Sequence, residues 1–414
     1  MRRTLTGVAV PAVTVATAAA VLAAGSGSAA AASGPTAADK SIAAKLSSRF
    51  PAAHLGTNAG GLVRDVASGR TVWAQGSAKA LMPASTEKLA TAAAVLKILG
   101  PNRTVRTRAL LSGHTLYLVG GGDMHLTSTD LDALAKAAAT ALKARGLTSV
   151  GLRVDDSLFP APALSPGWSS GYYPSTLAPV RALALLGDRV NDTSLHAGQV
   201  FARRLSSAGV HASAPTRAKA PAGAVQLASR TSAPLAAAVE YMLKNSDNNV
   251  AEGVARLAAL ATHRAANWQG VTATVRAALA GYHVPTAGTV AYDASGLSRS
   301  DRMTAGTLAY LAALSVDPRY HATLWPVYAG LPIAGKDGTL SKAEGRFTTK
   351  PSNCAVGKLE AKTGTLTGAV ALAGVTRAKD GRWKSFAFVE NGSLATATAR
   401  RALDGLAATV VGCW

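Results

Sequence analysis

The sequence predicts a mixed α/β (α+β) protein, because stretches with strand periodicity and stretches with helix periodicity follow one another along the chain. The chain has 414 residues, of which 48% are hydrophobic and 16% charged. It is therefore long and apolar enough to bury one or two cores, which excludes wholesale disorder. The strand-like runs are 61–74, 105–111, 115–119 and 150–154, and the alanine-rich helical runs are 88–99, 131–145 and 235–244.

The clearest local prediction lies near the C-terminus. Two β-like runs, 368–377 and 382–391, are joined through Asp380-Gly381, a dipeptide suited to a tight hairpin turn. A helix from about Ala395 to Val411 should follow. We expect this hairpin and its helix to support the fold, and any catalytic residues to lie at the rim of the hairpin.

The net charge is strongly positive: 43 Lys and Arg against 22 Asp and Glu give +21. Such a chain is attracted to polyanions, whether nucleic acid, lipid head groups or an anionic cell envelope. Charge alone does not choose among these three classes of partner.

The first 32 residues narrow this choice. Arg2 and Arg3 precede an apolar run at 7–25, and a small-residue stretch follows that ends at Ala32. This layout is typical of a secretory signal peptide, with an uncleaved membrane anchor as the alternative. Cleavage would leave a secreted chain of charge +19 that begins with a flexible leader at 33–40. We therefore expect a cell-wall location and no nucleic-acid partner.

The chain has two cysteines, Cys354 and Cys413. In an exported protein an even pair is read more easily as a disulfide than as a metal site. Two buried free thiols are the alternative. The eight histidines show no metal-ligand spacing, so we expect no metal centre.

One segment has the composition of a nucleophile and its base. Pro83-Ala84-Ser85-Thr86-Glu87-Lys88 leads into an alanine-rich helix that stops at Gly100-Pro101. If that helix begins at Ser85, Lys88 lies three residues on and on the same face. A desolvated lysine can take the proton of a serine hydroxyl without any histidine, and the helix N-terminus favours a developing oxyanion. Taken alone, Ser85 could equally be a helix cap and Lys88 a surface lysine.

Two further motifs change that balance. Ser246-Asp247-Asn248 stands before another alanine-rich helix, and Lys362-Thr363-Gly364-Thr365 opens the strand-rich C-terminal region. Together with Ser85 and Lys88 they follow the order S-x-x-K, S-D-N, K-T-G. This is the set found in penicillin-binding proteins and class A β-lactamases.

Beyond these motifs the chain resembles the low-molecular-mass class C penicillin-binding proteins, the D-alanyl-D-alanine carboxypeptidase/endopeptidase family. The resemblance covers nearly all of the chain after the leader. It implies a serine transpeptidase/β-lactamase-like domain with an antiparallel sheet and a helical cluster. The additional matching stretches are 116–123, 154–159, 293–299 and 331–340.

The resemblance implies a secreted serine DD-peptidase that acts on peptidoglycan stem peptides and is inhibited by penicillins. Ser85 would attack the carbonyl between the two terminal D-alanines, with Lys88 as proton acceptor, and form an acyl-enzyme. Ser246 and Lys362 would pass the proton to the leaving amine and hold the substrate carboxylate. Asn248 would bind the substrate amide.

The resemblance also implies the rest of the substrate site. The backbone N–H groups of Ser85 and Thr365 would form the oxyanion hole. Thr363, Gly364 and Thr365 would bind the substrate. Arg299 would contact the stem peptide. No cofactor is implied.

The spacing of the motifs predicts an inserted domain. Between Lys88 and Ser246 lie 157 residues, too many for a loop inside a packed domain. We therefore expect a catalytic domain made of 33–100 and 230–414, interrupted by an insert at 101–229. The insert looks shorter than in the family. In some family members an acidic residue shortly after the Gly-Trp pair helps to bind the side-chain amine of a diamino acid in the substrate, and none follows Gly167-Trp168 here. Tyr172 and Tyr173 are the only alternatives in that segment for binding the amine.

The three motifs leave two alternative functions open. A serine β-lactamase would share the three motifs and differ by rapid deacylation. A non-catalytic wall-binding protein would use its positive charge to sit on anionic wall polymers. The intact Ser85, Lys88, Ser246 and Lys362 favour an enzyme.

Overall fold

The computed structural model describes residues 34–392 and 394–414. The expected signal peptide at 1–32 lies outside this part of the chain. Within the described residues, no helix combines the length and the apolarity needed to cross a membrane.

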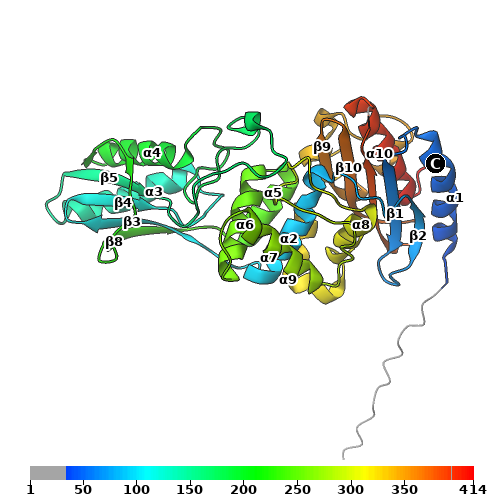
Figure 1. Ribbon diagram of the computed structural model, residues 1–414, viewed down its shortest axis with the longest axis horizontal. Helices are drawn as coiled ribbons and strands as arrows, with labels where there is room; N and C mark the ends of the chain where they lie inside the picture. The colour runs from blue at the N-terminus through cyan, green and yellow to red at the C-terminus, as the bar shows by residue number, and fades with distance from the viewer. Residues whose placement is uncertain (1–33, 393) are drawn as a thin grey trace, which may run out of the picture. The chain divides into compact units, whose positions relative to one another are not determined.

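A five-stranded antiparallel sheet is built from both ends of the chain, in the order β2–β1–β11–β10–β9 (Figure 1). β1 pairs with β11 although more than 300 residues separate them in sequence. The strands are β1 (Ala59–Asp65), β2 (Thr71–Gln75), β9 (Leu359–Leu366), β10 (Ala369–Arg377) and β11 (Trp383–Glu390).

The central strands are buried on both faces because their residues alternate between two cores. Val370 and Leu372 of β10 pack with the N- and C-terminal helices α1 (Ala37–Ala52) and α10 (Thr396–Val411). The small side chains of Ala371 and Ala373, on the other face, meet a cluster of helices. At these four positions of β10 the larger side chains face the terminal helices and the alanines face the helical cluster.

Helix α2 (Lys88–Leu99) lies in the middle of that cluster, and every side chain from Lys88 to Leu96 is buried. Its run of alanines lets neighbouring helices approach closely on all sides. The surrounding helices are α5 (Leu235–Asn245), α6 (Asn248–Ala261), α7 (Trp268–Ala280), α8 (Ala305–Leu314) and α9 (His321–Gly330).

A second sheet forms from residues between α2 and α5, in the order β6–β5–β4–β3–β8, with β7 also paired to β5. β4 and β5 are parallel, and α3 crosses between them. α3 and α4 supply the apolar core of this sheet. Its elements are β3 (Arg106–Ser112), β4 (Thr115–Val119), α3 (Ser128–Lys143), β5 (Ser149–Asp155), α4 (Thr193–Ser207), β6 (His211–Ala212), β7 (Thr216–Arg217) and β8 (Val225–Thr231).

The C-terminal hairpin and helix are confirmed to within two residues at each end. The prediction of a flexible leader at 33–40 is wrong, because α1 begins at Ala37. Thr36 caps it: its hydroxyl accepts from the Asp39 N–H, and the Asp39 carboxylate accepts from the Thr36 N–H. This reciprocal capping box satisfies two otherwise unpaired donors and fixes the helix start.

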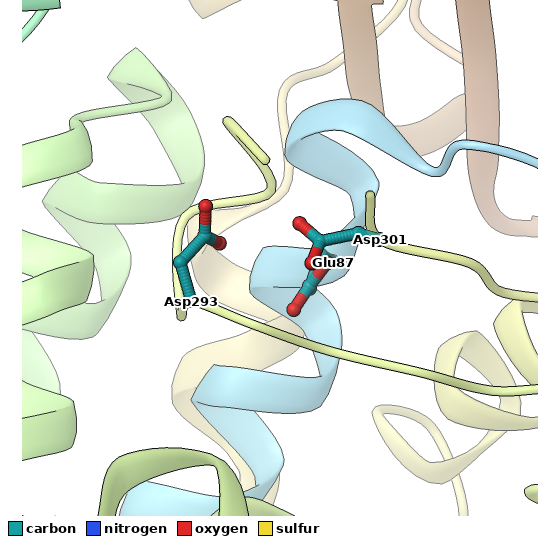
Figure 2. A group of neighbouring side chains, drawn as sticks. All are labelled: Glu87, Asp293 and Asp301. Carbon is teal, nitrogen blue, oxygen red and sulfur yellow. The ribbon is translucent and has the colours of Figure 1, made fainter. Parts of the chain in front are cut away.

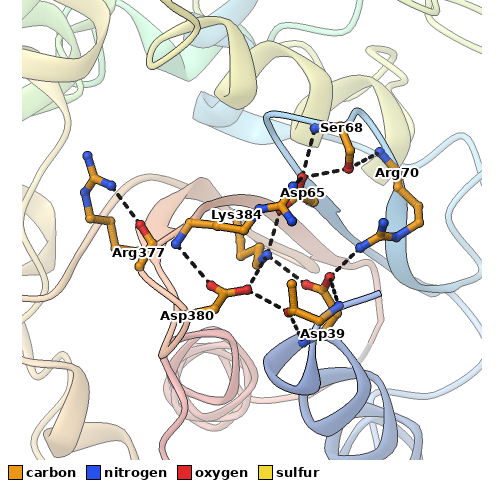
Figure 3. A network of polar contacts seen from close by, with 10 residues as sticks. Asp39, Asp65, Ser68, Arg70, Arg377, Asp380 and Lys384 are labelled. Atoms are coloured by element: carbon orange, nitrogen blue, oxygen red, sulfur yellow. Dashed lines mark hydrogen bonds and ion pairs between the residues drawn. The ribbon is translucent and has the colours of Figure 1, made fainter. Parts of the chain in front are cut away.

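A buried ion-pair network ties α1 to the sheet (Figure 3). The Lys384 Nζ on β11 lies 2.8 Å from Asp39, 2.7 Å from Asp65 and 3.1 Å from Asp380. The lysine side chain is fully buried. The predicted disulfide between Cys354 and Cys413 is confirmed and holds the end of α10 to the segment before β9.

Candidate active site

The candidate nucleophile lies where a short 3₁₀ turn, Ala84–Glu87, runs into α2. Residues three apart nearly eclipse in a 3₁₀ turn, so Lys88 reaches back to Ser85. The Lys88 Nζ donates to the Ser85 Oγ at 2.9 Å. Lys88 is fully buried, whereas Ser85 is half-buried and open to a substrate.

Two further acceptors hold the Lys88 amine. These are the Asn248 Oδ1 at 2.8 Å and the Ser295 carbonyl at 2.6 Å. Burial lowers the pKa of Lys88 to about 8, against the opposing charges of nearby carboxylates, of which Asp293 and Asp247 act most strongly. A lysine with this pKa is partly neutral near pH 8 and can accept a proton.

Two glycines let other segments approach the nucleophile closely. A Cβ on Gly364 of β9 would lie 2.5 Å from the Pro83 carbonyl oxygen. A Cβ on Gly296 would lie 2.0 Å from the Ala84 carbonyl oxygen, and Ala84 itself has a φ of +46°. The chain before Ser85 is thus held in a left-handed conformation between β9 and the 293–299 turn, a strain typical of functional sites.

The Ser246-Asp247-Asn248 motif forms the junction of α5 and α6. Ser246 ends α5 with a φ of +57°, and the Asp247 carboxylate caps α6 by accepting from the Val250 N–H at 2.9 Å. Asn248 bonds to Lys88 and also donates to the Thr176 carbonyl at 3.1 Å. The described residues provide no hydrogen bond to the Ser246 hydroxyl.

The Lys-Thr-Gly-Thr segment lies on the edge strand β9. Lys362 is fully buried, and its Nζ donates to the Thr363 carbonyl at 2.9 Å. Burial, reinforced by the charge of Lys88, places the pKa of Lys362 well below its ordinary value. The hydroxyls of Thr363 and Thr339 are 2.7 Å apart.

Arg299 reaches the end of the same strand. It is exposed, and its Nη1 donates to the Thr367 carbonyl at 2.9 Å, in the turn after β9. The structure therefore brings Ser85, Lys88 and Asn248 into direct contact. It places Lys362 and Arg299 on or beside β9, without a bond to the first three.

The 293–299 turn contains a feature that motif spacing did not predict. Asp293 accepts the N–H groups of Ser295 and Gly296 through Oδ1, and that of Ser298 through Oδ2. Its Oδ2 also accepts the indole N–H of Trp168 at 2.5 Å. Asp293 thereby fixes the turn whose Ser295 carbonyl holds Lys88. Tyr172 and Tyr173 are the alternatives for binding a substrate amine. Their hydroxyls donate to backbone carbonyls instead.

Three buried carboxyl groups converge beneath the nucleophile: Glu87, Asp293 and Asp301 (Figure 2). One oxygen of each lies within 4.8 Å of the others, a spacing that could hold a cation. Burial and mutual repulsion raise the pKa of Glu87 well above its usual value and that of Asp301 to about 9. Within the described part of the chain, the Glu87 Oε2 and the Asp301 Oδ2 are buried and accept no hydrogen bond. Because Asp293 is already occupied by N–H donors, a shared proton between Glu87 and Asp301 fits this cluster better than a metal.

The sequence profile of the D-Ala-D-Ala carboxypeptidase 3 (S13) family matches residues 42–188 and 181–410. The chain belongs to this family. It is 34% identical over 377 residues to a carboxypeptidase of Mycobacterium tuberculosis, covering 85% of this chain and 80% of that protein. It is 33% identical over 404 residues to the carboxypeptidase DacB of Mycolicibacterium smegmatis, covering 92% and 86%.

Among solved structures, this S13-family chain resembles penicillin-binding protein 4 of Haemophilus influenzae. The TM-score is 0.72 at 21% identity, and the match covers 86% of this chain and 95% of that one. This likeness confirms the predicted fold class. The family membership confirms the resemblance that the motifs indicated.

Proposed function

We propose that this protein is a serine DD-peptidase: a D-Ala-D-Ala carboxypeptidase of peptidoglycan stem peptides that also cleaves cross-links as a DD-endopeptidase. One observation carries the proposal. The buried amine of Lys88 lies 2.9 Å from the half-buried hydroxyl of Ser85, so a base of lowered pKa touches a reachable nucleophile. The S13 family membership supports the choice of substrate.

In the proposed reaction, Lys88 takes the Ser85 proton as Oγ bonds to the carbonyl carbon of the penultimate D-alanine. The N–H groups of Ser85 and Thr365 stabilise the oxyanion. The peptide C–N bond then breaks, and the amine of the last D-alanine leaves with the proton, which the Ser246 hydroxyl relays. Water hydrolyses the ester and restores Ser85.

Several contacts support these roles. The position of Gly364 against Pro83 sets β9, and with it Thr365, beside the nucleophile turn. Asn248 keeps one N–H and one oxygen lone pair for a substrate amide after its bonds to Lys88 and Thr176. Thr363 and Gly364 lie on β9, and Arg299 bonds to Thr367 just after it. We assign these three residues to substrate binding.

The test is acylation by a labelled penicillin, followed by intact mass measurement and peptide mapping. We expect a stable adduct on Ser85 in the wild type and in the matched exposed control Ser207→Ala, and none in Ser85→Ala. D-Alanine release from a pentapeptide should be lost in the same variant. Absence of an adduct with the penicillin intact would favour a wall-binding protein, and absence with the penicillin destroyed a β-lactamase.

We further propose that 1–32 is a cleaved signal peptide, that the protein acts outside the cytoplasm, and that 101–229 is an inserted domain. The strands of the second sheet support the last point, since all of them lie between Arg106 and Thr231. β8 runs two residues past the expected boundary, so we propose that the insert ends after Thr231.

Retention on anionic wall polymers is the final part of the proposal. Four arginines line one cleft beside β1 and β11 and outnumber its single carboxylate, Asp317. These guanidinium groups belong to Arg64, Arg319, Arg377 and Arg382. Binding to purified wall should weaken as salt is added, because screening reduces charge attraction. Wall binding that does not change with salt would contradict this part.

A further inference from the structure

A cation from outside the three motifs touches the candidate substrate strand. Arg400 lies in the second turn of α10 and is half-buried. Its Nη2 donates to the Thr365 Oγ1 at 3.2 Å. Because an arginine donates only, the Thr365 hydroxyl keeps its own proton available for another acceptor. A guanidinium and a hydroxyl donor therefore stand side by side at the strand that borders Ser85.

Arg400 has no carboxylate partner among the described residues. The nearby Asp404 is taken by Arg346, whose Nε lies 3.0 Å from the Asp404 Oδ2. The Arg400 Nε is shielded from solvent and makes no hydrogen bond within that part of the chain. Burial and the charge of Arg346 both disfavour the Arg400 charge and lower its pKa. A guanidinium placed in this way gains from an anion that arrives from outside.

Lys362 is poorly placed to supply that charge. Its Nζ is fully buried and directed to the Thr363 carbonyl, and burial keeps its pKa well below the ordinary value. Arginine, in contrast, stays protonated in proteins and presents a fork that matches two carboxylate oxygens.

We propose that Arg400, with the Thr365 hydroxyl, recognises the C-terminal carboxylate of the stem peptide and the equivalent carboxylate of penicillins. This inference rests on the proposed DD-peptidase function. It assigns the recognition of a free terminal carboxylate to a residue of the C-terminal helix, in place of the carboxylate role that the resemblance implies for Lys362.

The test compares two acylating agents that differ only in this group: a penicillin with its free carboxylate and the methyl ester of the same penicillin. The second-order rate of Ser85 acylation is measured by intact mass for the wild type, Arg400→Gln, Arg400→Lys and Arg401→Gln. Arg401 is the matched control, since it is exposed, adjacent in sequence and carries the same charge.

We expect Arg400→Gln to slow acylation by the free acid about 10- to 100-fold, the effect of losing a hydrogen-bonded charge pair. Acylation by the ester should change less than about threefold. Arg400→Lys should recover part of the loss, and Arg401→Gln should match the wild type. If Arg400→Gln slowed acylation by the acid and by the ester equally, the role of Arg400 would be structural and the proposal would be overturned. An Arg400→Gln variant that kept the wild-type preference for the acid would also overturn it. Failure of the wild type to react with either compound would instead contradict the proposed function.

Discussion

The indole N–H of Trp168 donates to the Asp293 carboxylate at 2.5 Å, which joins two segments that lie 125 residues apart. Asp293 also accepts three backbone N–H groups of its own turn. The Ser295 carbonyl on that turn holds the Lys88 amine at 2.6 Å. Three hydrogen bonds therefore link Trp168 through Asp293 and Ser295 to the base that we assign to the reaction.

Trp168→Phe tests this connection. The substitution keeps a ring against Trp268, whose centroid lies 4.8 Å away, and removes the donor. We expect the free energy of unfolding to fall by about 1–3 kcal/mol, because the buried carboxylate loses a hydrogen bond. Penicillin acylation should slow about tenfold as the turn loosens. Chemical denaturation and acylation kinetics measure these effects. Trp325→Phe, at an exposed tryptophan, is the control, and equal behaviour of the two variants would refute the connection.

The pH dependence of acylation should report Lys88. Its pKa of about 8 means that the amine is charged below pH 8 and becomes a base above it. The acylation rate should therefore rise with pH through a midpoint near 8. Stopped-flow or quenched-flow labelling from pH 6 to 9 measures this profile. A flat profile in that range would argue against Lys88 as proton acceptor.

Asp247→Asn should move this midpoint. The Asp247 charge raises the pKa of Lys88, so its removal lowers that pKa and shifts the rise in rate to lower pH. Asparagine caps a helix as well as aspartate does, so α6 should keep its start. The same pH profile measures the shift, and Asp132→Asn on α3 serves as a distant control. A midpoint that moves upward would contradict the assigned sign.

Gly364→Ala should separate activity from stability. The added Cβ would lie 2.5 Å from the Pro83 carbonyl oxygen and 3.2 Å from the Ala84 Cβ, so β9 must move away from the nucleophile turn. We expect acylation to fall at least ~100-fold, an effect comparable to the loss of an oxyanion donor. Gly405→Ala on α10 meets no atom within 4 Å and should raise the free energy of unfolding by about 0.5–1 kcal/mol. Unimpaired acylation in Gly364→Ala would disprove the close approach.

Lys384→Met should destabilise the protein by about 3–5 kcal/mol, because it removes the lysine cation from the buried carboxylates of Asp39 and Asp65 and from the partly buried Asp380. The network also predicts acid sensitivity. Hydrogen bonding and charge from Lys384 lower the pKa of Asp65 from its ordinary value of 3.8 to about 2, so this contribution to stability is present above pH 4. About 2 kcal/mol should be lost as the pH falls through 2. Denaturation across pH measures both effects, and exposed Lys358→Met should change neither.

Much of the local structure could be predicted from the sequence. The run 88–99 coincides with α2, and Asp380-Gly381 does lie in the turn between β10 and β11. These features depend on side-chain periodicity and turn chemistry, which act over a few residues. α1 was missed, although Thr36 and Asp39 have capping-box spacing, because small polar residues before it look like a linker.

The sequence by itself determined the order of the three motifs, the family and the identity of the candidate nucleophile, because these depend on residue type and spacing. Only the tertiary structure decided which groups meet. Asn248 contacts Lys88 across 160 residues, Trp168 contacts Asp293 across 125, and Arg400 contacts Thr365 across 35. Such contacts depend on how helices and strands pack, and no local pattern records that packing. The burial that lowers the pKa of Lys88 has the same origin, since it is a property of the assembled core and not of the motif.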